Sequence, residues 1–242
     1  MLRAGLQTAL RLVYPPRCLI CGGLVETDFG LCGPCWRDTP FLAGLSCTCC
    51  GVPLPGASDE AEVCDDCLTT PRPWAQGCAA LLYRDNGRRL VLMLKHGDRY
   101  DIAGAAAGWM ARRARPLLRE GMIAVPVPLH LRRHLRRRFN QSALLARGLA
   151  TGLGIGWSPD ALERARHTPA LEGKTRNERF TMLDAAIRVA PKRAALIRDR
   201  PVLLVDDVMT SGATLGAAAD ACLAGGAREV CVCVLARVAK EA

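Results

Sequence analysis

From residue 73 onward, short apolar runs alternate with longer stretches whose apolar positions recur at helical spacing. The apolar runs predict strands at residues 78–83, 122–129, 201–208 and 229–236. The helical stretches fall at residues 88–95, 102–119, 141–153 and 215–224. Because the runs are rich in Val and Leu and alternate with helices, the pattern predicts an α/β fold with a parallel sheet covered on both faces. Ligands of such sheets sit at the carboxyl ends of the strands.

The first 72 residues follow a different pattern, and a Pro-Arg-Pro sequence at 71–73 marks a stiff, non-helical boundary. We therefore expect a small N-terminal module, 1–72, and a larger domain, 73–242. Residues 2–13 contain two arginines and end without a small-residue cleavage site, which favours a short docking helix over a signal peptide. No uncharged apolar run approaches the roughly 20 residues that span a bilayer, so we expect a cytoplasmic protein without membrane insertion.

Ten of the 13 cysteines lie between Cys18 and Cys78. Eight of them form Cys-x-x-Cys pairs, whose two-residue gap lets both sulfurs face one metal ion from a tight turn. Two such pairs complete a closed, tetrahedral thiolate site, so the spacing predicts up to two structural Zn²⁺ ions in two ribbons. The predicted metal ligands are Cys18, Cys21, Cys32, Cys35, Cys47, Cys50, Cys64 and Cys67.

Other interpretations of these cysteines carry less weight. A disulfide framework requires export, and four consecutive pairs are unusual for a redox site. Which pairs share a metal stays open, because sequential and interleaved arrangements both suit the spacing. Cys49 is an extra thiol that could replace a neighbour. The remaining four cysteines are expected to act as small core residues, with Cys231 and Cys233 on one strand face.

The chain is basic, with 33 Lys and Arg against 23 Asp and Glu, and a formal net charge of +10 over 242 residues. Such a surplus suggests phosphate-bearing partners. Eight thiolates and two Zn²⁺ ions together contribute −4, which leaves a moderate +6. Basicity alone therefore does not identify a nucleic-acid binder. Half of the residues are hydrophobic, which excludes disorder throughout the chain.

The most specific signal is the segment 202–214, with the sequence VLLVDDVMTSGAT. Its apolar residues form a strand whose carboxyl end presents Asp206 and Asp207, and a loop of hydroxyls and glycine then opens a helix. Backbone amides at this helix start, with the hydroxyls, form a cradle for a phosphate dianion. The two carboxylates stand where a sugar on that phosphate would place its hydroxyls, from which they accept hydrogen bonds.

Two other interpretations fit this segment less well. A solvated turn after a buried strand does not require so specific a set of residues. The acidic strand of a P-loop ATPase requires a phosphate loop elsewhere, and residues 172–175, EGKT, are the nearest match. Thr168 stands where that loop needs its first glycine, and no predicted strand leads into it, so the ATPase is rejected.

Residues 202–214 closely resemble the 5-phosphoribosyl-1-diphosphate (PRPP) signature of type I phosphoribosyltransferases. With the cysteine ribbons, the chain resembles the ComF family, competence-associated proteins with a double zinc ribbon ahead of a phosphoribosyltransferase domain. Further matching segments are LKHG at 94–97, VPVPLH at 125–130 and RFNQ at 138–141. The resemblance implies the type I phosphoribosyltransferase fold for residues 73–242.

The resemblance also implies roles for particular residues. The carboxylates would hold the ribose hydroxyls, the loop the 5-phosphate, and segment 128–133 the pyrophosphate. The residues expected to contact PRPP are Asp206, Asp207, Thr210, Ser211, Gly212, Ala213, Thr214, Pro128, Arg132 and Arg133. Segment 164–184 resembles a flap that closes over the site, with Lys174, Arg176 and Arg179 as contacts for the leaving group. The expected catalytic residues are Asp206, Asp207, Lys174 and Arg176.

Two functions follow from this resemblance. One is a phosphoribosyltransferase that transfers the phosphoribosyl group of PRPP to an unidentified acceptor, with Mg²⁺ and cations stabilising the departing pyrophosphate. The alternative is a non-catalytic component of the competence machinery that binds single-stranded DNA and uses PRPP as a regulatory ligand. The arginine run from Arg132 to Arg138, with His130 and His134, would contact phosphates of either ligand. The expected partners are thus PRPP, single-stranded DNA and other competence proteins.

Overall fold

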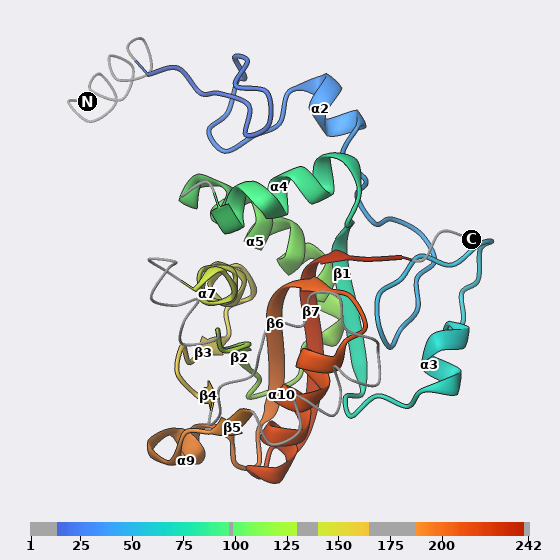
Figure 1. Ribbon diagram of the computed structural model, residues 1–242, viewed down its shortest axis with the longest axis vertical. Helices are drawn as coiled ribbons and strands as arrows, with labels where there is room; N and C mark the ends of the chain where they lie inside the picture. The colour runs from blue at the N-terminus through green and yellow to red at the C-terminus, as the bar shows by residue number, and fades with distance from the viewer. Residues whose placement is uncertain (1–13, 97–98, 130–139, 165–186, 240–242) are drawn as a thin grey trace.

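The computed structural model describes residues 14–96, 99–129, 140–164 and 187–239 (Figure 1). Several predicted features lie outside these residues. They are the helix at 2–13, the run of arginines and histidines between His130 and Arg138, and the flap cations Lys174, Arg176 and Arg179.

A five-stranded sheet forms the centre of the molecule, with the strand order β1-β7-β6-β2-β3. Its strands are β1 (Gln76–Leu82), β2 (Ile123–Pro126), β3 (Gly156–Trp157), β6 (Pro201–Met209) and β7 (Glu229–Arg237). Every pairing within it is parallel. The predicted α/β fold with a parallel sheet is therefore confirmed.

Alternate residues of β6 enter two different cores, as expected for a strand buried on both faces. Leu203 and Val205 face a core built with α4 (Asp85–His96), α5 (Tyr100–Ala114) and α7 (Gln141–Leu153). Val202 and Leu204 face a core built with α10 (Ala213–Ala224). The predicted covering of both faces by helices is thus confirmed.

Two predicted elements are shorter in the structure, and proline accounts for both. The helix expected at 102–119 ends as α5 at Ala114 and continues as a 3-10 turn, η1 (Arg115–Leu117), because Pro116 has no N–H to donate. The strand expected at 122–129 is reduced to β2 because Pro126 and Pro128 cannot donate to a neighbour. Between them, Val127 N still donates to Val205 O at 2.9 Å.

Some short elements have no clear periodicity in the sequence and were not predicted. They are the antiparallel pair β4 (Leu162–Arg164) and β5 (Ile187–Val189), the 3-10 turn η2 (Pro191–Arg193), and α9 (Ala194–Ile197). In the N-terminal module, α2 (Gly33–Arg37) and α3 (Asp65–Thr69) are single helical turns. Within the described residues, no helix combines the length and apolar character needed to cross a membrane.

The N-terminal module packs against the sheet in two places. Its first ribbon, residues 14–40, adds Leu19 and Ile20 to the core that contains α4 and α5. The second ribbon, residues 41–72, lies beside β1 (Figure 1) and adds Cys50 and Cys67 to the core that contains α10. Backbone hydrogen bonds join the module to β1: Leu42 N to Ala80 O at 2.9 Å, Leu82 N to Pro40 O at 2.9 Å, and Gly77 N to Thr48 O at 2.8 Å.

Candidate functional site

The strands β2 and β6 are neighbours, but the chain leaves them in opposite directions. From β2 it passes through α7 to β3 at one edge, and from β6 it passes through α10 to β7 on the other side. By the general rule for open α/β sheets, such a divergence places the ligand crevice at the carboxyl ends of the two strands. Of the segments singled out in the sequence, the one at Pro128 follows β2, and Asp206 lies near the carboxyl end of β6.

Asp206 lies in the last part of β6 and is held in one orientation. Its Oδ1 accepts hydrogen bonds from Ser142 Oγ at 2.8 Å and from Asp207 N at 2.8 Å. Burial and the neighbouring Asp207 charge raise the pKa of Asp206 to about 7, although the hydrogen bonds from Ser142 and Asp207 N oppose the shift. This carboxyl group can therefore exchange a proton near neutral pH.

Asp207 is paired with a cation from another element. Lys95, in the last turn of α4, places Nζ 3.0 Å from Asp207 Oδ1, with the two side chains 21% and 11% exposed. Every contact that described residues make with the two carboxylates goes to Oδ1 of each. The crevice thus holds two adjacent carboxylates and one ammonium group.

The N-terminus of α7 joins three parts of the site. Asn140 caps the helix, because its Oδ1 accepts from Ser142 N at 3.0 Å, and its Nδ2 donates to Val127 O after β2 at 3.5 Å. Gln141 is fully buried and its Nε2 donates to Lys95 O at 3.5 Å. Together with the Ser142 contact to Asp206, these bonds fix α4, β2 and β6 relative to one another.

The loop from β6 to α10, residues 210–212, opens the helix two residues earlier than the sequence pattern predicts, since α10 begins at Ala213. Gly212 precedes it with φ +82, a left-handed conformation that glycine adopts without steric cost. A Cβ there would also lie 3.2 Å from both Arg72 Nη1 and Trp74 Cη2, so a side chain would require these two neighbours to move by a few tenths of an ångström. Thr210 is exposed beside it.

The structure adds residues to the site that the sequence did not assign. Lys95 and Ser142 reach the carboxylates, and Asn140 caps the helix that carries Ser142. Lys95 and Asn140 belong to segments 94–97 and 138–141, whose resemblance to a family was the only available signal. Of the expected pyrophosphate segment, Pro128 is described, and its carbonyl accepts from Arg164 Nε at 3.1 Å. Arg132 and Arg133 lie outside the described residues.

The eight paired cysteines form two clusters, each with its four sulfurs within 4.8 Å of one another. The first cluster is Cys18, Cys21, Cys32 and Cys35, and the second cluster is Cys47, Cys50, Cys64 and Cys67. Adjacent pairs along the chain therefore share a site, which decides between the sequential and interleaved arrangements. None of the thirteen cysteines, all of which are described, forms a disulfide.

The geometry of both clusters fits zinc. A tetrahedral site with Zn–S bonds of about 2.3 Å has sulfur–sulfur edges of about 3.8 Å. Cys21 Sγ and Cys32 Sγ are 3.6 Å apart in the first cluster, and Cys50 Sγ and Cys64 Sγ are 3.7 Å apart in the second. Four thiolates leave no open position for a substrate, so these are structural sites. Cys231 and Cys233 lie in one core, as expected for residues on one strand face.

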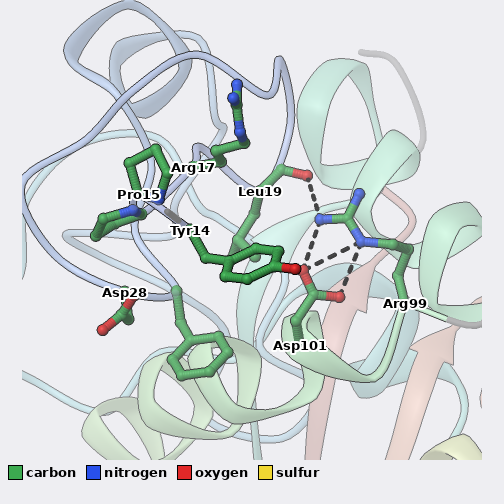
Figure 2. Close-up of a pocket in the computed structure, with 9 residues that line it drawn as sticks. Tyr14, Pro15, Arg17, Leu19, Asp28, Arg99 and Asp101 are labelled. Atoms are coloured by element: carbon green, nitrogen blue, oxygen red, sulfur yellow. Dashed lines mark hydrogen bonds and ion pairs between the residues drawn. The ribbon is translucent and has the colours of Figure 1, made fainter. Parts of the chain in front are cut away.

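A separate cleft of about 340 Å³ lies where the first ribbon meets α5 (Figure 2). Tyr14 and Phe29 line it with exposed rings, beside Arg17. Arg99 pairs with Asp101 at 2.6 Å and donates to Leu19 O at 3.3 Å, which fastens the first ribbon to the start of α5. This cleft therefore belongs to the ribbon contact, away from the carboxylate pair.

Comparisons with known proteins agree with both halves of the chain. The double zinc ribbon model matches residues 9–68, and the phosphoribosyl transferase domain model matches residues 140–242. The "DNA utilization protein YhgH" of Salmonella typhimurium is 34% identical over 233 residues, covering 93% of this chain and 99% of that protein. "Competence protein F" of Haemophilus influenzae is 28% identical over 227 residues, covering 91% and 96%.

A solved structure described as the allosteric regulatory enzyme of purine biosynthesis is 19% identical, with a TM-score of 0.40. This chain matches only 30% of that enzyme's length, and the match covers 60% of this chain, so it adds nothing to the assignment. The assignment rests on a full-length relative above 30% identity and on both modules in the same order. The chain belongs to the ComF family, in which a double zinc ribbon precedes a phosphoribosyltransferase domain.

Proposed function

We propose that this chain binds PRPP in the crevice between β2 and β6 and transfers its phosphoribosyl group to a nucleophile. The observation that supports this best is the position of Asp206, Asp207 and the loop 210–212 at one strand end, beside the diverging strand β2. A sugar phosphate needs an anion cradle and hydroxyl acceptors a few ångströms apart, and this arrangement supplies both.

Each part of the site has a task in this proposal. The amides and hydroxyls from Thr210 to Thr214 hold the 5-phosphate at the start of α10. Asp206 and Asp207 accept hydrogen bonds from the ribose hydroxyls, and Ser142 keeps Asp206 oriented. Lys95 leaves Asp207 when the sugar arrives and turns its charge towards the pyrophosphate.

Mg²⁺ prefers oxygen ligands. In this proposal, hydroxyls of PRPP would bind the ion, and the second carboxylate oxygens of Asp206 and Asp207 would accept hydrogen bonds from those hydroxyls. When bound with PRPP, Mg²⁺ would neutralise charge on the departing pyrophosphate. The cations Lys174, Arg176, Arg132 and Arg133, all outside the described residues, are proposed to contact the same group. They exclude water and hold the leaving group as the bond to the sugar breaks.

The test is a titration of the full chain with PRPP by calorimetry, with and without Mg²⁺. We expect binding that Mg²⁺ strengthens, followed by pyrophosphate release when the correct acceptor is present. Free bases and single-stranded DNA are the acceptors to screen first. A chain that retains two zinc ions but gives no heat with PRPP and Mg²⁺ would overturn the proposal.

A second candidate function is binding of single-stranded DNA. It is favoured by the names of the relatives, a DNA utilization protein and a competence protein, and by the exposed rings of Tyr14 (77%) and Phe29 (58%) beside Arg17. Aromatic faces next to cations stack bases without sequence preference. In this case PRPP would regulate binding, and other competence proteins would be partners. Thirteen cysteines without a disulfide suit a reducing compartment, so we place either function in the cytoplasm.

The DNA function has its own test. If single-stranded DNA binds, log K against log[salt] should fall with a slope of about −0.7 per phosphate contacted. Replacing Arg136 and Arg137 should flatten this slope by one or two such units, whereas Phe29→Ala should weaken binding with the slope unchanged. Absence of binding at low salt excludes the DNA function for the isolated chain.

A further inference from the structure

Two arginines donate hydrogen bonds to backbone carbonyls of the loop 210–212 and of the residue before it. Arg237, at the end of β7, is 4% exposed, and its Nη1 donates to Met209 O at 3.2 Å and to Thr210 O at 2.7 Å. Arg72 Nη1 donates to Ser211 O at 2.8 Å. Cations from outside the loop therefore fix three successive carbonyls, one at the end of β6 and two in the loop.

These bonds set the direction of the loop amides. In a planar trans peptide, the carbonyl of one residue and the N–H of the next point in opposite directions. Holding Thr210 O and Ser211 O on the arginine side thus aims the N–H groups of Ser211 and Gly212 at the open side. Among the described residues, neither of these N–H groups has an acceptor. The open side is where we propose that the phosphate lies.

Both arginines are connected to one Cys-x-x-Cys turn of the second cluster, residues 47–50, one directly and the other through Trp74. Arg237 Nη2 lies 3.8 Å from Cys50 Sγ and donates to it. Arg72 lies over the ring of Trp74, 5.6 Å from its centroid, and Trp74 Nε1 donates to Cys49 O at 2.7 Å. The same Trp74 ring also fills the space next to Gly212. Two separate connections thus run from this turn to the loop.

The charges explain why the turn has to be in place. Arg237 forms no ion pair with any described carboxylate, and a buried guanidinium without a counter-charge is costly. A Zn²⁺ ion with four thiolates carries a net charge of −2, which supplies the counter-charge next to it. Without the metal, the four cysteine side chains are no longer joined, and the turn loses the bonds that order it.

We propose that the second zinc site positions the loop 210–212 through Arg237 and the Trp74–Arg72 pair, so that metal binding there strengthens phosphate binding. This inference rests on the proposed PRPP site for its ligand, but the control of the loop by the metal stands apart from it. Arg237 is a positioning residue in this view and does not touch the ligand. Coupling between two sites is reciprocal in binding free energy, so PRPP must also strengthen zinc binding at this site in equilibrium competition with a chelator.

The two clusters provide a matched pair of variants in the full chain. Cys64→Ser breaks the second site without altering the turn at 47–50, and Cys21→Ser breaks the first site as its control. Arg237→Met removes the connection while all eight ligands remain. In the ligand-free protein, amide hydrogen exchange of Gly216, whose N–H donates to Gly212 O at 2.8 Å, serves as the measure of loop exchange. Exchange of the β6 amides confirms that the fold is retained.

We expect Cys64→Ser and Arg237→Met to speed loop exchange at least tenfold and to weaken PRPP binding at least tenfold. Cys21→Ser should change neither, and Arg237→Met should keep about two zinc ions. If Cys64→Ser and Cys21→Ser give the same loop exchange, the inference is overturned. A different result separates the two proposals. If the wild-type protein does not bind PRPP, but Cys64→Ser speeds loop exchange and Cys21→Ser does not, the proposed function is wrong and the coupling of the second zinc site to the loop is confirmed.

Discussion

Lys95 Nζ lies 3.0 Å from Asp207 Oδ1, which joins the end of α4 to the end of β6. The ammonium group is ion-paired with Asp207, whereas burial and the charge of Asp207 raise the pKa of the neighbouring Asp206. The ligand-free site therefore contains one paired carboxylate and one carboxyl group that titrates near neutral pH. This asymmetry leads to the first predictions.

Removing the charge of Lys95 should destabilise the fold. Lys95→Met leaves Asp207 without its cation, and we expect a loss of about 1–3 kcal/mol, below the roughly 3–5 kcal/mol of fully buried pairs. The double variant Lys95→Met/Asp207→Asn should be closer to wild type than the single variant, because it leaves no unpaired charge. Urea unfolding of the wild type, the two single variants and the double variant measures this difference. If the double variant loses the sum of the stability losses of the two single variants, the ion pair is contradicted.

Replacing both carboxylates should abolish most PRPP affinity. Asp206→Ala/Asp207→Ala removes the proposed acceptors for the ribose hydroxyls, so the dissociation constant should rise at least tenfold, or about 1.4 kcal/mol. Calorimetry with Mg²⁺ present measures it. Asp160→Ala is the matched control, because this exposed carboxylate pairs with Arg193 away from the crevice. Wild-type affinity in the double variant would show that the site is misplaced.

PRPP binding should depend on pH through Asp206. Its pKa of about 7 exceeds the ordinary value of 3.8, so the carboxyl group is protonated below pH 7 in the free protein. A carboxylate that accepts from hydroxyls must lose this proton, and affinity should therefore rise with pH up to about 7 and then level off. Calorimetry in buffers of different ionisation enthalpy measures the proton released. In the Asp206→Asn variant, the only pH dependence of PRPP affinity that remains should come from titration of the PRPP phosphates.

Purified protein that has not met a chelator should contain about two zinc ions, bound by the eight paired cysteines. Cys21→Ser and Cys64→Ser should each remove about one ion. Because both ribbons contribute side chains to the cores of the sheet, stripping the metal should lower the Tm of the whole chain. Elemental analysis and calorimetry test these statements, and protein without zinc that melts like the zinc-loaded form would contradict them.

The elements with strong local signals were predictable from the sequence. The helix at 141–153 matches α7 at both ends, because Asn140 caps its start and Gly154 adopts the left-handed conformation that ends it. The strand at 201–208 differs from β6 by one residue because its apolar run is continuous. By contrast, β4 and β5 have three residues each and no periodicity to detect.

The contacts of the site were harder to predict, because they join distant parts of the chain. Nothing in the local pattern brings Lys95 to Asp207 or Ser142 to Asp206, since these pairs meet only when the helices pack on the sheet. The partners of the Cys-x-x-Cys turns were undecided for the same reason, as both arrangements fit the spacing. The packing of Arg237 behind the loop carries no sequence signal at all.

The hydrogen bonds between the ribbons and β1 have a consequence for solubility. β1 is an edge strand, and residues of the N-terminal module form hydrogen bonds with Gly77 N, Ala80 O and Leu82 N of this strand. Gly77 lies so close to the module that a Cβ would collide with Cys49 O. An uncovered edge strand is a template for pairing with another copy of the chain. A fragment cut at residue 72 would expose such a template, so the ribbons protect the domain against strand-to-strand aggregation.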